Sequence, residues 1–144
     1  MTSTLPEVRR NPFNDPAKKP QWAQLTRLGG DRVAILFEDL RREIAKVDGI
    51  VESLRYSGSE EGWVAEYRAD GTTLFTARTF PGVLEATMTF DASTFERLSR
   101  SGKLGARMKN ALRIAENSGF IRLDLNHSSA VRSFASLVVA KSKL

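Results

Sequence analysis

Six aromatic and polar side chains recur at alternate positions of three segments between residues 63 and 87, and together they have the chemistry of a ligand site. Aromatic rings can enclose an apolar ligand, and hydroxyl groups can orient it. The guanidinium of Arg78 can hold a carboxylate or phosphate through two parallel hydrogen bonds. We therefore predict a site for a small anionic or amphipathic ligand, formed by Trp63, Tyr67, Thr76, Arg78, Glu85 and Thr87.

The last third of the chain supplies a second candidate, a basic surface. Residues 91–144 contain ten Lys and Arg against four Asp and Glu, whereas residues 1–90 contain twelve against thirteen. Clustered cations can bind nucleic acid by releasing its counterions. An ordinary solvated helix face with few acids has the same pattern, and no aromatic residues for base stacking are interleaved here. The alternative prediction is a nucleic-acid-binding helix carrying Lys103, Arg107, Lys109 and Arg113.

Catalytic residue types are scarce. The chain has no cysteine and one histidine, His127, which has Asp124 nearby but no nucleophile-elbow motif. Glu60 and Glu61 are adjacent, so their side chains point in different directions, and no cluster has metal-ligand spacing. No glycine-rich phosphate loop is present. We therefore rank an enzyme below a binding module and expect no metal and no cofactor.

Length and composition are typical of one compact domain. The chain has 144 residues, 41% of them hydrophobic, and a net charge of +5. No segment approaches the roughly 20 apolar residues of a membrane span. The proline-containing segment 1–19 is polar and lacks the apolar centre of a signal peptide. We therefore expect a cytoplasmic protein with no membrane partner.

Four short strands are predicted between residues 50 and 90, at 50–56, 62–69, 72–80 and 83–90. Asp70-Gly71 lies between two alternating segments, which is the preferred signal for a two-residue hairpin loop. Pro81-Gly82 combines a fixed φ with a permissive glycine and predicts a second tight turn.

Two-residue loops at both turns would fix which side chains share a face. The first ladder would pair Tyr67 with Leu74, Ala65 with Thr76 and Trp63 with Arg78. The second would pair Arg78 with Glu85 and Thr76 with Thr87. The six candidate residues would then lie on one face, and a slip of one residue would exchange the faces. The other face is apolar and should lie under the helices: Val64, Phe75, Ala77, Leu84, Ala86, Met88 and Phe90.

Helical sequence flanks these strands. Apolar residues recur at steps of three and four in segment 31–48, which predicts an amphipathic helix. Further helices are predicted at 20–28, 91–100, 103–118 and 129–141, with a fifth strand at 120–125. We expect an extended or partly disordered arm at 1–19 and one α+β domain at 20–144. Its sheet has four or five mainly antiparallel strands, with helices packed on one face.

Other interpretations of the Trp63 face stay open. The segment around Trp22 could cover this face as a second small core. Arg78 and Glu85 could be a cross-strand pair worth only a few tenths of a kcal/mol. An uncovered aromatic face is also typical of a homodimer interface, which predicts a dimerisation or interaction domain.

Short motifs resemble those of a protein family. Tyr56-x-Gly58 is followed by Gly62-Trp63-x-x-x-Tyr67 and a hairpin with Leu74, and a closing strand at 120–123 precedes a helix ending in Val138-Val139-Ala140-Lys141. This is similar to small bacterial domains of unknown function that are loosely related to YdhG and YjbR-like proteins. The resemblance implies an α+β fold with an antiparallel sheet and helices on one side, and it implies no catalytic residues. It also implies DNA binding for YjbR-like domains and iron handling for YdhG-like ones, but this chain lacks an acidic ridge for iron.

Overall fold

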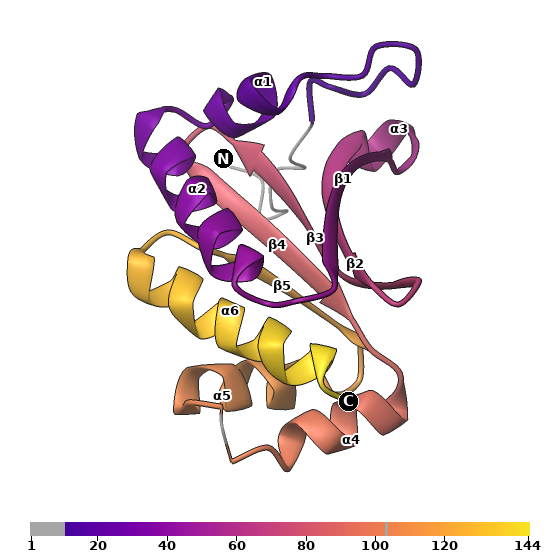
Figure 1. Cartoon of the computed structure of the whole chain (residues 1–144), viewed down its shortest axis with the longest axis vertical. Coiled ribbons are helices and arrows are strands. Elements are labelled where there is room, and N and C mark those ends of the chain that lie inside the picture. Colours follow the sequence, from indigo (N-terminus) through magenta and orange to yellow (C-terminus); the bar gives the residue numbers. More distant parts are fainter. Residues whose placement is uncertain (1–10, 103) are drawn as a thin grey trace, which may run out of the picture.

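The computed structural model describes residues 11–102 and 104–144, and a five-stranded sheet is its central element. The strands lie side by side in their chain order, and each is antiparallel to the next (Figure 1). They are β1 (Ile50–Tyr56), β2 (Trp63–Ala69), β3 (Thr72–Phe80), β4 (Val83–Thr89) and β5 (Phe120–Asp124). The predicted meander and its fifth strand are confirmed.

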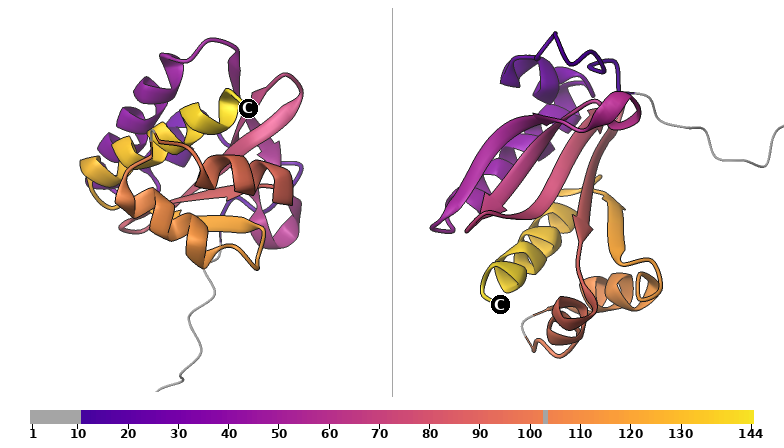
Figure 2. Two further views of the ribbon diagram at one scale, coloured as in Figure 1. Left: turned by 90° about the horizontal axis from the view of Figure 1, so that it is seen from below. Right: turned by 90° about the vertical axis from the view of Figure 1, so that its right-hand side faces the viewer.

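The helices α2 (Asp31–Ala45) and α6 (Ser128–Ser142) cover one face of this sheet. The other helices of the described residues are α1 (Trp22–Arg27), α3 (Gly58–Glu61), α4 (Ala92–Ser99) and α5 (Ala106–Ile114). The helices α2 and α6 lie side by side across the sheet, and α4 and α5 pack beside α6 (Figures 1 and 2). The predicted α+β class, with helices packed on one face of an antiparallel sheet, is confirmed.

The core forms where the apolar stripe of α2 and the inner face of α6 meet the sheet. Phe37 and Leu40 of α2 are fully buried, as are Leu84 and Met88 of β4. The ring of Phe134 in α6 meets the ring of Phe75 edge-on, with centroids 5.0 Å apart. Burial of these side chains supplies most of the driving force for the fold.

Four of the predicted helices are longer than the observed ones, namely 20–28, 31–48, 91–100 and 103–118. The prediction of 31–48 exceeds α2, because the Lys46 and Val47 N–H groups close a tighter turn onto Glu43 and Ile44. The prediction of 103–118 exceeds α5, because Gly105 has extended backbone with φ −72° and ψ 168°. Periodicity locates a helix more reliably than it locates the ends of the helix.

Both predicted tight turns are present. Ala69 pairs with Thr72 across Asp70 and Gly71, and these two residues have φ angles of 52° and 76°. Positive φ at both central positions matches the right-handed twist of the strands. Phe80 pairs with Val83 across the second turn.

A β-bulge in the first hairpin changes the predicted register. Arg68 pairs with Thr73 beside the turn, but Tyr67 pairs with Phe75, so Leu74 is an extra residue in β3. The predicted pairs Tyr67–Leu74, Ala65–Thr76 and Trp63–Arg78 are therefore wrong. The ammonium group of Lys141 in α6 donates to the carbonyl oxygens of Thr73 (3.4 Å), Leu74 (3.1 Å) and Thr89 (2.6 Å). The lysine thus links two carbonyl groups at the bulge in β3 to the last residue of β4.

The bulge moves part of β2 to the opposite face. Ala65 and Tyr67 lie on the helix-covered side with Phe75 and Ala77, as their pairing and burial show. By the same alternation Trp63 faces the helix side and Val64 faces away from it, which reverses the prediction for both. Along β3 and β4 the predicted faces hold.

Candidate functional site

Four of the six predicted ligand residues lie together on the sheet face opposite α2 and α6, here called the polar face. The predicted pairs Arg78–Glu85 and Thr76–Thr87 are confirmed. Trp63 and Tyr67 project from the other side of the sheet, because the bulge intervenes. The predicted combination of aromatic walls and Arg78 on one surface is therefore wrong.

Arg78 and Glu85 form a buried ion pair on the polar face. Arg78 Nη2 and Nε donate to Glu85 Oε1 at 2.5 and 3.1 Å, and the side chains are only 8% and 3% exposed. The guanidinium also lies over the ring of Phe80, 4.9 Å from its centroid. Charges removed from water need such partners, so this pair is more than a surface contact.

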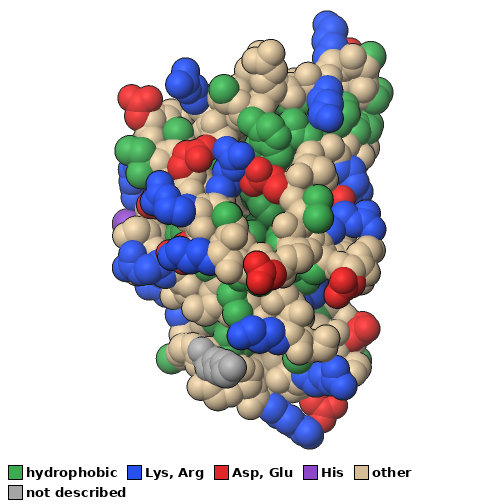
Figure 3. Space-filling model, viewed as in Figure 1, with side chains coloured by type: hydrophobic (Ala, Val, Ile, Leu, Met, Phe, Trp, Pro, Cys, Tyr) green, Lys and Arg blue, Asp and Glu red, His purple; other side chains and the backbone are tan. Residues whose placement is uncertain are grey.

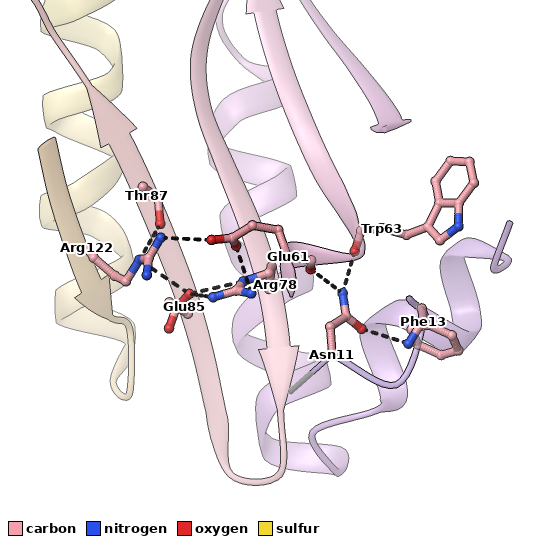
Figure 4. A network of polar contacts seen from close by, with 8 residues as sticks. All are labelled: Asn11, Phe13, Glu61, Trp63, Arg78, Glu85, Thr87 and Arg122. Carbon is pink, nitrogen blue, oxygen red and sulfur yellow. Dashed lines mark hydrogen bonds and ion pairs between the residues drawn. The ribbon is translucent and has the colours of Figure 1, made fainter. Parts of the chain in front are cut away.

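Two residues that the sequence did not single out complete this network (Figure 4). Glu61 at the end of α3 pairs with Arg78 Nη1 at 2.8 Å and with Arg122 Nη2 at 3.4 Å. Arg122 Nε donates to the Thr87 hydroxyl at 3.1 Å. Two arginines and two glutamates balance in charge, so each arginine already has a carboxylate partner.

Trp63 is held by the segment 11–15 and not by α1. Its backbone N–H donates to the Phe13 carbonyl and its indole N–H to the Asp15 carbonyl, both at 2.8 Å. The buried Asn11 side chain donates to the Glu61 and Trp63 carbonyls. A Cβ at Gly62 would lie 2.5 Å from the Phe13 carbonyl oxygen, so this close approach needs glycine.

Tyr67 belongs instead to a groove between α2 and β1. The groove encloses about 400 Å³ and is lined by Glu38, Arg41, Arg42, Ile44, Ala45, Ile50, Glu52 and Tyr67. Figure 3 shows hydrophobic side chains in a hollow between α2 and β1, with acidic and basic side chains around it. The lining therefore combines an apolar surface with charges of both signs.

Glu52 is the centre of hydrogen bonding in this α2–β1 groove. Its carboxylate accepts from Arg41 Nε (3.0 Å), Arg41 Nη2 (2.8 Å) and the Tyr67 hydroxyl (2.7 Å). Arg41 Nη1 donates to Glu38 at 2.8 Å, and the Arg41 guanidinium lies 4.8 Å from the centroid of a Trp22 ring. Side chains from α1, α2, β1 and β2 thus form one cluster around Glu52.

Two members of the cluster, Arg41 and Tyr67, have pKa values above their usual range. The hydrogen bonds from Arg41 to Glu52 raise the pKa of Arg41, partly opposed by its burial. Burial raises the pKa of Tyr67 far above its usual value of 10.0, and the charge of Glu52 adds to this effect. Tyr67 is therefore a hydrogen-bond donor, and it stacks on Phe75 with centroids 4.4 Å apart.

The basic residues of the alternative site spread around α5. Arg107, Lys109 and Arg113 are all exposed, while Met108 and Leu112 face the core. At 100° per residue, Arg107 lies on one flank of the helix and the other two lie on the opposite flank. Lys103 lies outside the described residues. The structure does not gather these cations into one stripe.

Within residues 11–102 and 104–144, no three His, Cys, Asp or Glu residues lie where they could hold a metal ion. No helix in the same ranges is long and apolar enough to cross a membrane. His127 precedes α6 and lies 3.4 Å from Arg32, measured from Nδ1 to Nη2.

Comparisons with protein-family models, curated proteins and solved structures found no match to this chain. The candidate site is therefore argued from its own geometry.

Proposed function

We propose that this protein is a non-enzymatic binding module that takes a small amphipathic ligand in the α2–β1 groove. The observation that carries the proposal is the buried Tyr67 hydroxyl, which meets the Glu52–Arg41 pair inside a hollow with an apolar lining. Small-molecule sites commonly combine apolar enclosure with a few fixed polar groups. A cytoplasmic location and a relationship to the YdhG and YjbR-like domains remain part of the proposal.

The groove favours a ligand with a polar head and an apolar body. Its polar lining has two carboxylates, Glu38 and Glu52, and two guanidinium groups, Arg41 and Arg42. Arg41 uses three of its five N–H donors within the cluster, which leaves two for a ligand. Ile44 and Ile50 provide the apolar contact.

Filling the groove tests this proposal. Ala45 is exposed and lines the groove, so Ala45→Leu should occlude it without removing a hydrogen bond. We expect a panel of small amphipathic carboxylates and amines to shift the amide NMR signals of Ile50 and Glu52. The substitution should weaken that response at least about tenfold, equivalent to about 1.4 kcal/mol.

The matched control is Ala106→Leu, which adds the same side chain at an exposed position of α5. The control should bind like the unmodified protein. No response at the groove across the panel, or equal binding by the two variants, would contradict the proposal.

A nucleic-acid-associated function is the second proposal. It is favoured by the absence of acidic partners for Arg107, Lys109 and Arg113 among the residues that the structure describes. Binding should weaken with salt, and replacing Arg107 and Lys109 by glutamine should reduce the slope of log K against log salt by about one per contact. No binding at low salt would remove this proposal.

A further inference from the structure

On the polar face, a carboxylate of the chain itself bridges two arginines from different strands. Glu61 Oε2 lies 2.8 Å from Arg78 Nη1, and Glu61 Oε1 lies 3.4 Å from Arg122 Nη2 (Figure 4). Each carboxylate oxygen therefore has its own guanidinium group. This is the arrangement by which arginines recognise carboxylates in ligands.

We propose that Arg78 and Arg122 form a binding site for a small carboxylate anion, and that Glu61 is its displaceable internal ligand. The site is on the opposite side of the sheet from the α2–β1 groove. This proposal does not depend on the function proposed for that groove.

Burial divides the network into a fixed half and an exchangeable half. The side chains of Arg78 and Glu85 are 8% and 3% exposed, whereas those of Glu61 and Arg122 are 38% and 43% exposed. Water reaches the outer half, so the Glu61 carboxylate can rotate outward while the Arg78–Glu85 pair stays in place. The exposed Glu61–Arg122 pair contributes little net stability, and on the buried Arg78 the incoming carboxylate takes the place of Glu61.

The backbone at Glu61 does not need to move during the exchange. Its carbonyl oxygen accepts from the Asn11 amide at 3.0 Å, and the adjacent Gly62 N–H donates to Gly58 at 2.7 Å. These contacts hold the end of α3, whereas the Glu61 carboxylate has its ion pairs within residues 11–102 and 104–144 with the two arginines. Release of the carboxylate is therefore a side-chain rotation.

Charge balance favours an anion in place of Glu61. With Glu61 rotated out, Arg78 and Arg122 keep their contacts with Glu85, at 2.5 and 3.7 Å, and each loses its contact with the Glu61 carboxylate. A bound carboxylate replaces that contact. The Thr87 hydroxyl accepts from Arg122 Nε and keeps this guanidinium oriented toward the site. The Glu61 carboxylate competes for the same guanidinium nitrogens, which lowers the affinity of the unmodified protein for an external carboxylate.

The test uses propionate, which reproduces the Glu61 side chain beyond its Cα atom, and Glu61→Gln, which removes the competing charge. Propionate binding is followed through the Nε–H NMR signal of Arg122. We expect Glu61→Gln to bind propionate at least about tenfold more tightly than the unmodified protein. Glu61→Ala provides the same comparison if the glutamine variant folds poorly, which thermal unfolding would show.

Glu60→Gln is the matched control, because it removes one negative charge from the neighbouring position of α3. It should leave propionate binding unchanged. Adding Arg122→Gln to Glu61→Gln should abolish the gain in propionate affinity. Equal binding by the Glu60 and Glu61 variants, or a gain that survives the loss of Arg122, would overturn the proposal. Tighter binding of inorganic phosphate than of propionate would overturn the assignment to carboxylates.

Discussion

The two faces of the sheet each carry an arginine–glutamate pair, and the pairs differ chiefly in exposure to water. In the α2–β1 groove, Arg41 and Glu52 meet at 2.8 Å with both side chains 28% exposed. On the polar face, Arg78 and Glu85 meet at 2.5 Å with side chains 8% and 3% exposed. Residue types and distances are nearly the same.

This difference shows how burial separates a structural pair from an exchangeable one. A buried charge that loses its partner is left unpaired in a medium of low dielectric constant. A half-exposed charge recovers contact with water or with another anion. The same residue types therefore favour stability at one position and exchange with a ligand at the other.

The largest effect that would test this comparison is on stability. We expect Glu85→Gln to lower the free energy of unfolding by about 3 kcal/mol, the lower end of the range for a broken buried pair, because Arg78 then keeps, among the described residues, only the half-exposed Glu61 as a charged partner. Glu52→Gln is the control from the other face and should cost about 1 kcal/mol, since Arg41 remains partly hydrated and the glutamine oxygen can still accept from the Tyr67 hydroxyl. Denaturant unfolding measures both. Equal losses would show that exposure does not distinguish the two pairs.

The next effect concerns the bulge that puts Tyr67 and Arg78 on different faces. Lys141→Met should cost about 1–3 kcal/mol, because the carbonyl groups of Thr73, Leu74 and Thr89 lose their shared donor. The exposed Lys143 provides the control, and Lys143→Met should change stability by less than about 0.5 kcal/mol. Both are measured by denaturant unfolding. Similar losses would mean that the lysine does not hold the bulge.

The hairpins show how far local sequence can predict this fold. Asp70-Gly71 and Pro81-Gly82 act within a few residues, so both turns and the second ladder are predicted correctly. Lys141 contacts the bulge residue Leu74 from a position 67 residues further along the chain. Local patterning contains no signal for this contact. A shift of one residue then exchanges the faces of β2.

The candidate groove could not be predicted from the sequence for the same reason, because it depends on contacts between distant segments. Arg41 has the appearance of an ordinary residue on the solvated face of an amphipathic helix, and Glu52 that of a polar residue in a strand. Their encounter depends on how α2 crosses the sheet, which helical periodicity does not determine. Glu61 lies between the predicted strands 50–56 and 62–69, where the sequence analysis predicted no helix. Tyr67 was the one groove residue singled out in advance.

A further effect on stability distinguishes the two tyrosines, Tyr67 and Tyr56. The Tyr67 hydroxyl donates to the carboxylate of Glu52, whereas the Tyr56 hydroxyl donates to the Asn14 carbonyl at an exposed site. Tyr67→Phe should cost about 1.5–3 kcal/mol, because hydrogen bonds to charged groups are the stronger ones. Tyr56→Phe should cost less than about 0.5 kcal/mol. The reverse order, measured by denaturant unfolding, would contradict the role of Glu52 as the centre of the cluster.

The smallest effect is on alkaline pH dependence. Burial raises the pKa of Tyr67 in the folded protein above the value of 10.0 in the unfolded chain. Its contribution to stability is therefore fully present below pH 10.0 and is lost as the pH rises toward the folded pKa. Tyr67→Phe should thus lose less stability than the unmodified protein above this pH. In near-ultraviolet absorbance titrations, Tyr67 should ionise only as the protein unfolds, so the variant and the unmodified protein should coincide before unfolding. Ionisation of Tyr67 in the folded state would mean that hydroxide reaches the bottom of the groove, and the cluster would then lack the buried donor on which the proposed site depends.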